Sequence, residues 1–594
     1  MKNIYRFLTV LAGLAFGGVA LAQNLDPTVV VDRAYEGKLM EAHKPALEMA
    51  VPDTVMRFDL DFDYSVFENP YKGSYEFNPY LLSMKPSAPT DEAGRLYLRA
   101  GAGYQLRPEL DFVWSPKLRS DAFRLDVYAD HRSYIGDYLD LDYERIHREC
   151  IHSDAPVMIG PVKTAWKGYD LNTDAGVAMS YDWEKGKVGL DIGYYGLHQK
   201  DKNWTRGYNA VDASFEVGSK NADVADFMYG LSADYRYAED NASKINGDET
   251  GFIGENNLDV DFRMRKGLKD NSAFRLDAGL YFAGYTGSVE NASSDLYVGA
   301  GYVYHKGILQ ADLGAKVALY VADTTLVDFE VPAKNQYIYP DVKVRLNVFP
   351  KFMSMFVNAT GGPKVKSYSS ILEGNHHVEL SFPGWVSYHE GKPTVIGYKM
   401  GVELERVALA AGFEGRIGSN FSYRLFGEYT DYASGMLDSA VYSFMMYSEV
   451  KRVTPGVVYL PYKKASASFE WRWSSDSFAS YGGVTYTDVF GDVLDDGLSC
   501  LKPAAWTGDV SFVYNYRKRI FGGISCDFAT QRIGGMSSLA IPGYADLGVS
   551  FEYVTSRSLS FWAKGGNLLG MNIQRNPVYI VDDPYFTLGI CLNL

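Results

Sequence analysis

Apolar and polar side chains alternate with a period of two along most of this chain, from about residue 94 onward. In the segment NLDVDFRMRKG, four apolar residues alternate with four charged ones: Leu258, Val260, Phe262 and Met264 against Asp259, Asp261, Arg263 and Arg265. The pattern continues to the last residue, where every second side chain is apolar: Phe586, Leu588, Ile590, Leu592 and Leu594. Because successive side chains of a β-strand point to opposite faces, each segment predicts a strand with one apolar and one polar face.

The amino terminus indicates export. Lys2 and Arg6 precede an uncharged apolar run that ends in Ala20-Leu21-Ala22, a small-x-small cleavage signature. This arrangement is typical of a secretory signal peptide, so we expect residues 1–22 to be removed. Loss of Lys2 and Arg6 takes the formal charge from −15 to −17. Such acidity argues against a nucleic-acid partner, because phosphate binding needs a basic face.

Two environments explain strands with one apolar and one charged face. A soluble β-sandwich buries the apolar face and leaves the charged face in bulk water. A membrane barrel turns the apolar face to lipid and the charged face to a wet lumen. Export, alternation without a domain break, and a final strand that ends with the chain favour the barrel. Lipid also admits only helices or closed barrels, since unpaired backbone groups there are costly.

The expected architecture is all-β: one large transmembrane antiparallel barrel of about 20–24 strands, with 22 favoured, over residues 91–594. A short periplasmic or lumen-filling segment of residues 23–90 precedes it. Five weakly alternating stretches are expected to be loops: 133–173, 239–254, 284–292, 361–395 and 489–505.

The polar faces of these strands supply candidate binding residues. Side chains of opposite charge two positions apart can form ion pairs that stiffen the wall, or can bind a polar ligand such as a sugar or peptide. The side chains that we expect to face the lumen are Arg124, Asp126, Asp259, Asp261, Arg263, Arg265, Arg275, Asp277, Lys343 and Arg345.

Cysteine and histidine give no catalytic or metal signature. The four cysteines are far apart in sequence and leave the disulfide state open. The histidine clusters HRECIH and GNHHVELSFPGWVSYHE match no standard zinc spacing, so we expect solvent-exposed loop histidines (His147, His152, His376, His377 and His389). GxSxG and HExxH motifs are also missing from the sequence. We therefore expect no cofactor, no metal and no enzymatic activity.

The carboxyl-terminal segment resembles the last hairpin of TonB-dependent outer-membrane receptors. FWAKGGNLLGMNIQRNPVY followed by DDPYFTLGICLNL is similar to that hairpin in turn and final strand. The resemblance implies that Phe586, Gly589, Ile590, Leu592 and Leu594 carry the signal that the barrel-assembly machinery reads. The final residue is a leucine, where that family most often has an aromatic residue.

Near the new amino terminus, Thr28, Val29, Val30 and Val31 look like the short box through which such receptors pair with TonB. A strand of a small periplasmic segment explains the same residues. Receptors of this family place a globular plug between box and barrel, whereas residues 23–90 contain no recognisable plug motif. A barrel of this size encloses a wide lumen, so we expect the leader, infolded loops such as 361–395, or a partner to fill it.

Two functions follow. The first is a receptor-like outer-membrane barrel that transports or gates a polar solute. The alternative is a non-catalytic outer-membrane scaffold that docks a partner in an export or assembly complex. The expected partners are outer-membrane lipids, the barrel-assembly machinery, and TonB or a lipoprotein or periplasmic protein.

Overall fold

A computed structural model describes the chain from residue 95 to residue 594 with internal gaps. The gaps are residues 119, 121, 153–156, 221–226, 246–249, 269–270, 290, 322–335, 350–351, 379–384, 390–391, 397–399, 446–449, 492–499, 534–538 and 582. The predicted signal peptide, the segment 23–90 and the TonB-like box lie outside the described residues. Among the described residues, no helix has both the length and the apolar character needed to cross a membrane.

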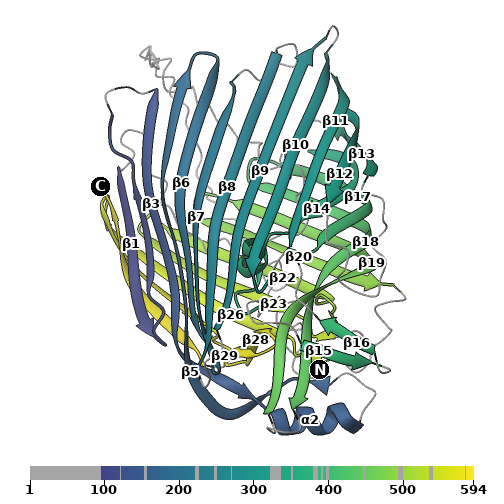
Figure 1. The fold of residues 1–594 in the computed structure, drawn as a ribbon. Helices are drawn as coiled ribbons and strands as arrows, with labels where there is room; N and C mark the ends of the chain where they lie inside the picture. The colour runs from purple at the N-terminus through teal and green to yellow at the C-terminus, as the bar shows by residue number, and fades with distance from the viewer. Residues whose placement is uncertain are drawn as a thin grey trace, which may run out of the picture. The chain divides into compact units, whose positions relative to one another are not determined.

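Twenty-two strands form a closed antiparallel barrel, as the alternation predicted (Figure 1). The wall strands are β1 (Leu96–Tyr104), β2 (Glu109–Trp114), β3 (Phe123–Leu141), β5 (Pro161–Trp183), β6 (Gly186–Lys200), β7 (Trp204–Ser219), β8 (Phe227–Lys244), β9 (Thr250–Gly267), β10 (Ser272–Gly287), β11 (Ala292–Lys306), β12 (Leu309–Val321), β13 (Gln336–Phe349), β14 (Met353–Val365), β17 (Val402–Ile417), β18 (Phe421–Met445), β19 (Val450–Ser474), β20 (Phe478–Phe490), β22 (Trp506–Tyr516), β23 (Ile520–Ala529), β26 (Tyr544–Ser556), β27 (Leu559–Gly566) and β30 (Tyr585–Asn593).

The remaining elements are short and belong to the connections between wall strands. They are β4 (Val157–Met158), β15 (Trp385–His389), β16 (Lys392–Ile396), β21 (Cys500–Leu501), β24 (Arg532–Ile533), β25 (Leu539–Ile541), β28 (Ile573–Asn576), β29 (Tyr579–Val581), α2 (Tyr143–His152) and α3 (Tyr368–Gly374). All of them lie in connections at one end of the barrel, which we call the loop end. The opposite end, where the chain ends at Leu594, has tight turns such as 184–185 and 307–308.

The wall reaches further toward the loop end than the sequence suggested. β3 and β5 extend through most of 133–173, and β8 and β9 occupy most of 239–254, which were expected to be loops. The expectation was wrong because alternation of apolar residues marks only the part of a strand that has an apolar outer face. On β8, exposed Tyr235 and Tyr237 are followed by Asn241 and Ser243 on the same face, while the hydrogen-bonded ladder continues.

Tyrosines mark the edge of the apolar belt on the outer face. The hydroxyl of Tyr194 donates to Asn209 Oδ1 at 2.7 Å, and the hydroxyl of Tyr235 donates to Asn256 Oδ1 at 3.0 Å. Both rings are exposed. Tyrosines with an apolar ring and a hydrogen-bonded tip are typical of the rim of a lipid-facing surface. On β8 the belt runs from Tyr229 to Tyr237, which is about the length that a tilted strand needs to cross a bilayer.

Closure of the barrel depends on the pairing of β1 with β30. Leu98 pairs with Leu592, and Gly101 pairs with Gly589. The Trp562 ring covers both glycines: a Cβ at Gly589 would lie 2.4 Å from this ring and 2.2 Å from the Ala100 carbonyl oxygen. Gly589 is therefore the residue that lets the last strand approach both neighbours. These contacts concern the folded barrel, and the role of the last strand as an assembly signal stays a prediction.

We expect Gly589→Val to weaken closure, because the added carbons overlap the Trp562 ring and the β1 backbone. Overpacking of this kind costs about 1–3 kcal/mol. The urea concentration at which half of the detergent-solubilised barrel unfolds should therefore fall. Unfolding is measured on gels from the mobility difference between heated and unheated samples. Leu588→Val is the matched control, since Leu588 is 57% exposed and loses one methylene. Equal midpoints for the two variants would contradict this account of closure.

Candidate functional site: an infolded loop against the barrel wall

The first part of the connection between β14 and β17, residues 366–378, folds back onto the barrel wall. Within it, Ser367 caps α3, its side-chain oxygen accepting a hydrogen bond from the Ser370 backbone N–H. The Asn375 N–H donates to the Ile371 carbonyl and ends the helix. β14 and β17 pair with each other, yet the helix lies against β6 to β10, so the segment leaves its own strands and crosses to another part of the wall. We call residues 366–378 the inner segment.

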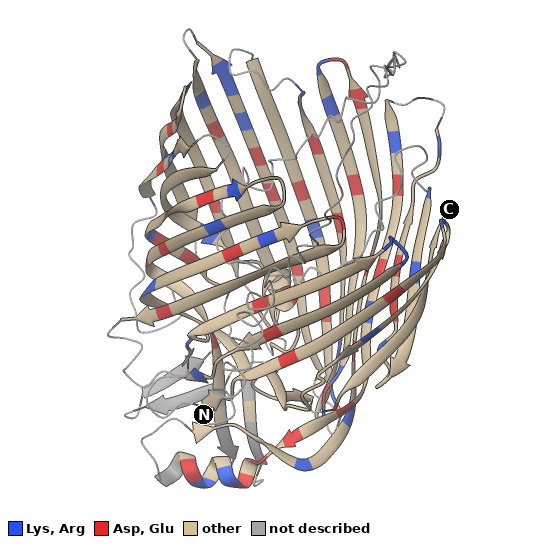
Figure 2. Cartoon of the chain, turned by 180° about the vertical axis from the view of Figure 1, so that it is seen from behind, with Lys and Arg blue, Asp and Glu red and all other residues tan. Residues whose placement is uncertain are grey.

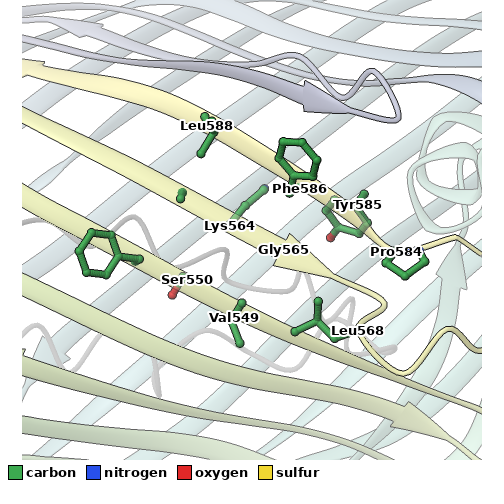
Figure 3. Close-up of a pocket in the computed structure, with 11 residues that line it drawn as sticks. Val549, Ser550, Lys564, Gly565, Leu568, Pro584, Tyr585, Phe586 and Leu588 are labelled. Atoms are coloured by element: carbon green, nitrogen blue, oxygen red, sulfur yellow. The ribbon is translucent and has the colours of Figure 1, made fainter.

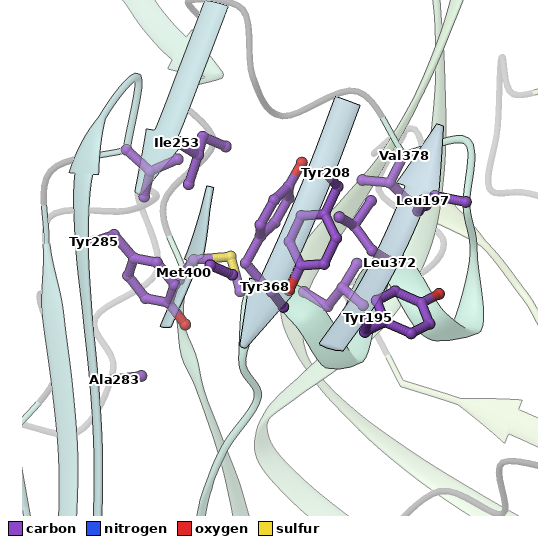
Figure 4. Close-up of a cluster of buried hydrophobic side chains, with 14 residues drawn as sticks. Tyr195, Leu197, Tyr208, Ile253, Ala283, Tyr285, Tyr368, Leu372, Val378 and Met400 are labelled. Atoms are coloured by element: carbon purple, nitrogen blue, oxygen red, sulfur yellow. The ribbon is translucent and has the colours of Figure 1, made fainter. Parts of the chain in front are cut away.

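Apolar side chains of the inner segment form a core with the wall (Figure 4). Tyr368, Leu372 and Val378 are completely buried. On the wall side they meet residues of β6, β7, β9 and β10: Tyr195, Leu197, Tyr208, Ile253 and Tyr285. Each fully buried side chain of this size contributes about 1.5–3 kcal/mol. The inner segment is therefore held as part of a packed core.

A completely buried ion pair anchors the inner segment to β7 and β8. Arg206 Nε lies 3.1 Å from Asp240 Oδ2, and neither side chain is exposed. The same guanidinium donates to the carbonyl oxygens of His376 at 2.9 Å and Val378 at 2.6 Å. The Tyr368 hydroxyl donates to Asp240. Charges buried this deeply are tolerated only when their partners are in place, so the anchor and the loop conformation depend on each other.

A second buried carboxylate holds the start of α3. Glu255 of β9 accepts hydrogen bonds from the Ser369 backbone N–H at 3.0 Å and from Asn257 Nδ2 at 2.6 Å. Its side chain lies beside the first turn of the helix, where unpaired N–H groups favour an anion. Arg236 of β8 adds an ion pair to Glu373 at 2.6 Å. Both ends of α3 are thus tied to the same part of the wall.

Two histidines follow α3 and meet one carboxylate of β5. His376 Nδ1 lies 3.1 Å and His377 Nε2 lies 3.8 Å from Asp170 Oδ2. Gln199 of β6 fixes the arrangement: its Oε1 accepts from Arg206 at 3.5 Å, while its Nε2 lies 3.3 Å from both Asp170 Oδ2 and His377 Nδ1. The prediction that these histidines are exposed to solvent is wrong for His377, which is 8% exposed.

The shared carboxylate moves the pKa values of the two imidazoles apart. Burial tends to lower the pKa of His376, but its contact with the Asp170 carboxylate outweighs this and raises the value above the ordinary one. For His377, burial dominates and lowers the pKa to about 3, since the attraction of Asp170 is offset by His376 and Arg206. His376 therefore holds a proton readily in this conformation and His377 does not.

A second loop closes over the first. The connection between β27 and β30 contains the hairpin of β28 and β29, and the Tyr579 ring of β29 stacks on His377 with centroids 3.2 Å apart. Its hydroxyl donates to Asp201 in the turn after β6. Tyr138 and Trp166 of β3 and β5 pack around the same ring. His377 thus lies between the wall and Tyr579.

An ion pair ties the same hairpin to the other side of the barrel closure. Arg575 of β28 lies 2.7 Å from Asp527 of β23 and 3.5 Å from Asp546 of β26. The hairpin therefore touches β3 through Tyr579 and β26 through Arg575. Four wall strands, β27, β30, β1 and β2, separate these two contacts around the barrel. A hairpin that links them spans part of the lumen.

Further connections pack together at the loop end. α2 contributes Ile146, β25 contributes Leu539 and Ile541, and β29 contributes Ile580 to one buried apolar cluster with Leu501. β4 and β25 pair in parallel within a small three-stranded sheet. These contacts join segments from four separate connections. The loop end of the barrel is consequently an interlocked layer of its own loops.

Several of the predicted lumen residues form ion pairs along the wall, whose strands carry charged residues at many positions (Figure 2). Arg275 lies 2.8 Å from Asp277 on its own strand and 2.6 Å from Asp341 on β13, and it also pairs with Asp312 of β12. The side chain reaches across β11 because Gly301 leaves space: a Cβ there would lie 3.2 Å from the guanidinium. Asp312 and Asp341 were not among the predicted residues.

The other predicted lumen residues are placed separately along the wall. Arg345 lies 2.5 Å from Glu414 of β17, and Arg265 lies 2.6 Å from the Met228 sulfur. Asp261 accepts from the Tyr297 hydroxyl, and Arg263 is 3.9 Å from Asp261. Four of the predicted residues remain. Asp126 accepts a hydrogen bond from the Ser115 hydroxyl, and Arg124 is exposed and lies opposite Ser180 in the strand register. In the same sense Asp259 lies opposite Asp234 and Tyr281, and Lys343 lies opposite Asp312 and Asn358. None of these contacts assigns them a ligand.

The other candidates bring no chemistry together in the described part of the chain. His147 meets the Tyr442 hydroxyl at 2.8 Å. The four cysteines are free thiols. The described residues contain no group of three histidine, cysteine or acidic side chains that would hold a metal ion. A hollow of about 410 Å³ lies over β26, β27 and β30, lined largely by apolar residues such as Val549, Phe551 and Leu588 (Figure 3).

Sequence reasoning missed the residues that hold the inner segment. Asp170 and Glu255 lie in or directly beside stretches that were expected to be loops. One signal was available: Trp204, Arg206 and Tyr208 alternate in WTRGYNAVDASF, which places an arginine between two aromatics on one face. The alternation does not show that a segment some 170 residues away would cover this face.

Comparison with known proteins identifies the fold. No protein-family model matches the chain, and no curated protein sequence does either. Solved structures do match. The siderophore receptor PirA of Acinetobacter baumannii has a TM-score of 0.58 at 11% identity, over 84% of this chain and 80% of the receptor. The FrpB iron transporter of Neisseria meningitidis has a TM-score of 0.57 at 9% identity (84% and 81% covered), and the copper transporter OprC 0.58 at 11% (85% and 82%). The receptor-like barrel inferred from the sequence is confirmed as a fold.

We expect Arg206→Met to release the inner segment, because Asp240 then remains buried without its cation. Removing one partner of a buried ion pair costs about 3–5 kcal/mol. Amide hydrogen exchange of residues 368–378, measured by mass spectrometry, should accelerate by roughly 100-fold or more. Lys187→Met is the control, because the Lys187–Glu216 pair is half exposed on both sides and contributes less than about 1 kcal/mol. Unchanged exchange in Arg206→Met would refute the anchor.

Proposed function

We propose that the chain is an outer-membrane, receptor-like barrel that admits a polar solute through a lumen gated by its own infolded loops. The apolar outer belt and the ion-paired inner wall support a membrane location, because lipid accepts the first and water the second. The predicted signal peptide supports export. The matched structures are described as a siderophore receptor, an iron transporter and a copper transporter, which supports transport as the general class.

The orientation follows from the two ends of the barrel. In barrels of this kind, short turns face the periplasm and longer loops face outward. The loop end carries the long connections 142–160, 366–401 and 567–584, whereas the connections at the other end have between two residues (184–185) and eight (115–122). The infolded loops therefore close the barrel from outside. A solute that enters from the medium meets the interlocked loops first and the inner segment next.

The observation that supports gating most directly is the course of the inner segment. It follows β14 directly and packs on β6 to β10, and Met400, two residues before β17, belongs to the same buried cluster. Seven wall strands, β7 to β13, lie between β6 and β14. A segment that links these parts of the wall occupies the lumen at that level. Its anchors are hydrogen bonds and ion pairs that can re-form, as a gate requires.

The same proposal includes the partners and excludes catalysis. Lipids surround the apolar belt, the barrel-assembly machinery reads the final strand from Phe586 to Leu594, and TonB pairs with Thr28–Val31. The last contact falls on residues outside those the structure describes. The ion-paired charges of the inner wall serve passage of a polar solute and no enzymatic step.

Excision of the infolded loop tests the gate. Val365 and Val402 are Cα partners in the β14–β17 pair, so a four-residue Gly/Ser turn can replace residues 366–401 and keep the ladder. We expect the excised barrel in planar bilayers to show a conductance several-fold above that of the full chain, because the lumen is cleared at that level.

The control for this experiment is Tyr237→Phe, which changes only an exposed side chain of the outer belt and should leave the conductance as it is. Heat-modifiable gel mobility shows that each barrel has folded. If the excised barrel conducts no more than the full chain, the inner segment is not the gate. A large constant conductance of the full chain would also contradict the proposal.

A further inference from the structure

We propose that His376 and His377 form a proton-operated latch that holds the inner segment closed most firmly near pH 6.5 and less firmly at lower and higher pH. This inference deepens the proposed function, because it concerns the regulation of the same gate. It is based on the position of the two histidines, which lie where the inner segment, the wall and the β28–β29 hairpin meet.

The two imidazoles have different surroundings although they are adjacent. His376 forms a close pair with Asp170 of β5, with Glu373 of α3 and Arg206 of β7 as the other charged groups near it. His377 lies between Tyr579 of β29 and Gln199 of β6, near Asp170, His376 and Arg206. Asp201 lies behind the Tyr579 ring, whose hydroxyl it binds. Each histidine therefore responds to protonation in its own way.

Hydrogen-bond directions require His377 to be neutral in the closed conformation. The Gln199 amide is oriented by Arg206, which donates to its Oε1, so its Nε2 donates to His377 Nδ1. An acceptor nitrogen cannot carry a proton. Protonation would oppose a donor to a donor and would place a third cation beside His376 and Arg206. Acid should therefore break the contact between His377 and Gln199 and loosen its stack with Tyr579.

The pH dependence of the latch has two limbs. In the closed conformation the pKa of His377 is about 3, while an opened, hydrated histidine has about 6.5. The open state binds more protons between these values, so closure weakens as the pH falls below 6.5, by about tenfold per pH unit. The contribution of His376 to closure changes with pH in the opposite direction. Its pKa is raised by closure, so its contribution is complete below 6.5 and is lost as the pH rises through the raised value.

Asp170 faces both imidazoles: its Oδ2 lies 3.1 Å from His376 Nδ1 and 3.8 Å from His377 Nε2. An aspartate carboxyl has an ordinary pKa of about 3.9, so a carboxylate is available to His376 over the range of pH in which closure is measured below. Closure should be strongest close to pH 6.5 and weaker on both sides.

Hydrogen exchange of residues 368–378 in the full-length, detergent-solubilised barrel tests the latch between pH 4.5 and 8.5, after division by the intrinsic exchange rates. We expect maximal protection near pH 6.5 and a fall on both sides. His377→Phe keeps a ring to stack on Tyr579 but cannot titrate, so it should lose the acid limb and keep the alkaline one. His376→Gln should lose the alkaline limb and keep the acid one.

His198→Gln is the matched control, because His198 is exposed on the face of β6 opposite to Gln199, and this variant should keep both limbs. A pH profile of protection that is flat in the unchanged protein overturns the latch. So does a His377→Phe variant that loses the alkaline limb, or a His376→Gln variant that loses the acid limb. Conductance recorded on the same samples separates this inference from the proposed function. Two-limbed protection with constant conductance retains the latch and rejects the gate. A flat pH profile of protection, together with a high conductance of the loop-excised barrel, rejects the latch and retains the gate.

Discussion

The hydrogen-bonded seam between β1 and β30 is the interaction on which the rest of the structure depends. Twenty-one strand pairs can form between neighbours in sequence, but the last pair joins residues near opposite ends of the barrel. Without it, the sheet has two edges of unpaired N–H and C=O groups, which lipid does not tolerate. Gly101, Gly589 and Trp562 make this seam close enough to pair. Closure in turn creates a wide interior, and the contents of that interior become the next structural problem.

The chain addresses this problem with its own connections. A packed apolar cluster supplies the affinity of the inner segment for the wall, and the buried polar groups determine its position. Arg206 is an example: it pairs with Asp240 and also binds two carbonyl oxygens of the segment, so it accepts only one placement of residues 376–378. Buried polar networks of this kind are favourable only when complete. A segment held in this way is either docked or released, which is the behaviour expected of a gate.

The sequence predicted the wall well and the contents of the lumen poorly, for a physical reason. Period-two alternation reports the two faces of one strand, and counting such segments predicted about 20–24 strands with 22 favoured, a range that includes the 22 wall strands found. The contact between His377 and Tyr579 joins segments 202 residues apart, and no local pattern reports it. Infolded loops such as 361–395 were one of three expected ways to fill the lumen, beside the leader and a partner protein. Residues 366–378 do pack against the wall, and the other two ways stay predictions. Exposure of His377 was predicted wrongly because a loop was assumed to face water.

Competition between the apolar and the polar contacts explains why the proposed gate would need titratable groups. Burial of Tyr368, Leu372 and Val378 favours the docked segment at every pH, and alone it would keep the lumen closed. A group that is neutral when buried and charged when exposed opposes that burial only over a limited range of pH. His377 meets this condition, and Asp170 gives His376 the opposite response. The pair can thus adjust closure in both directions while the apolar core, which supplies the affinity of the segment for the wall, stays unchanged.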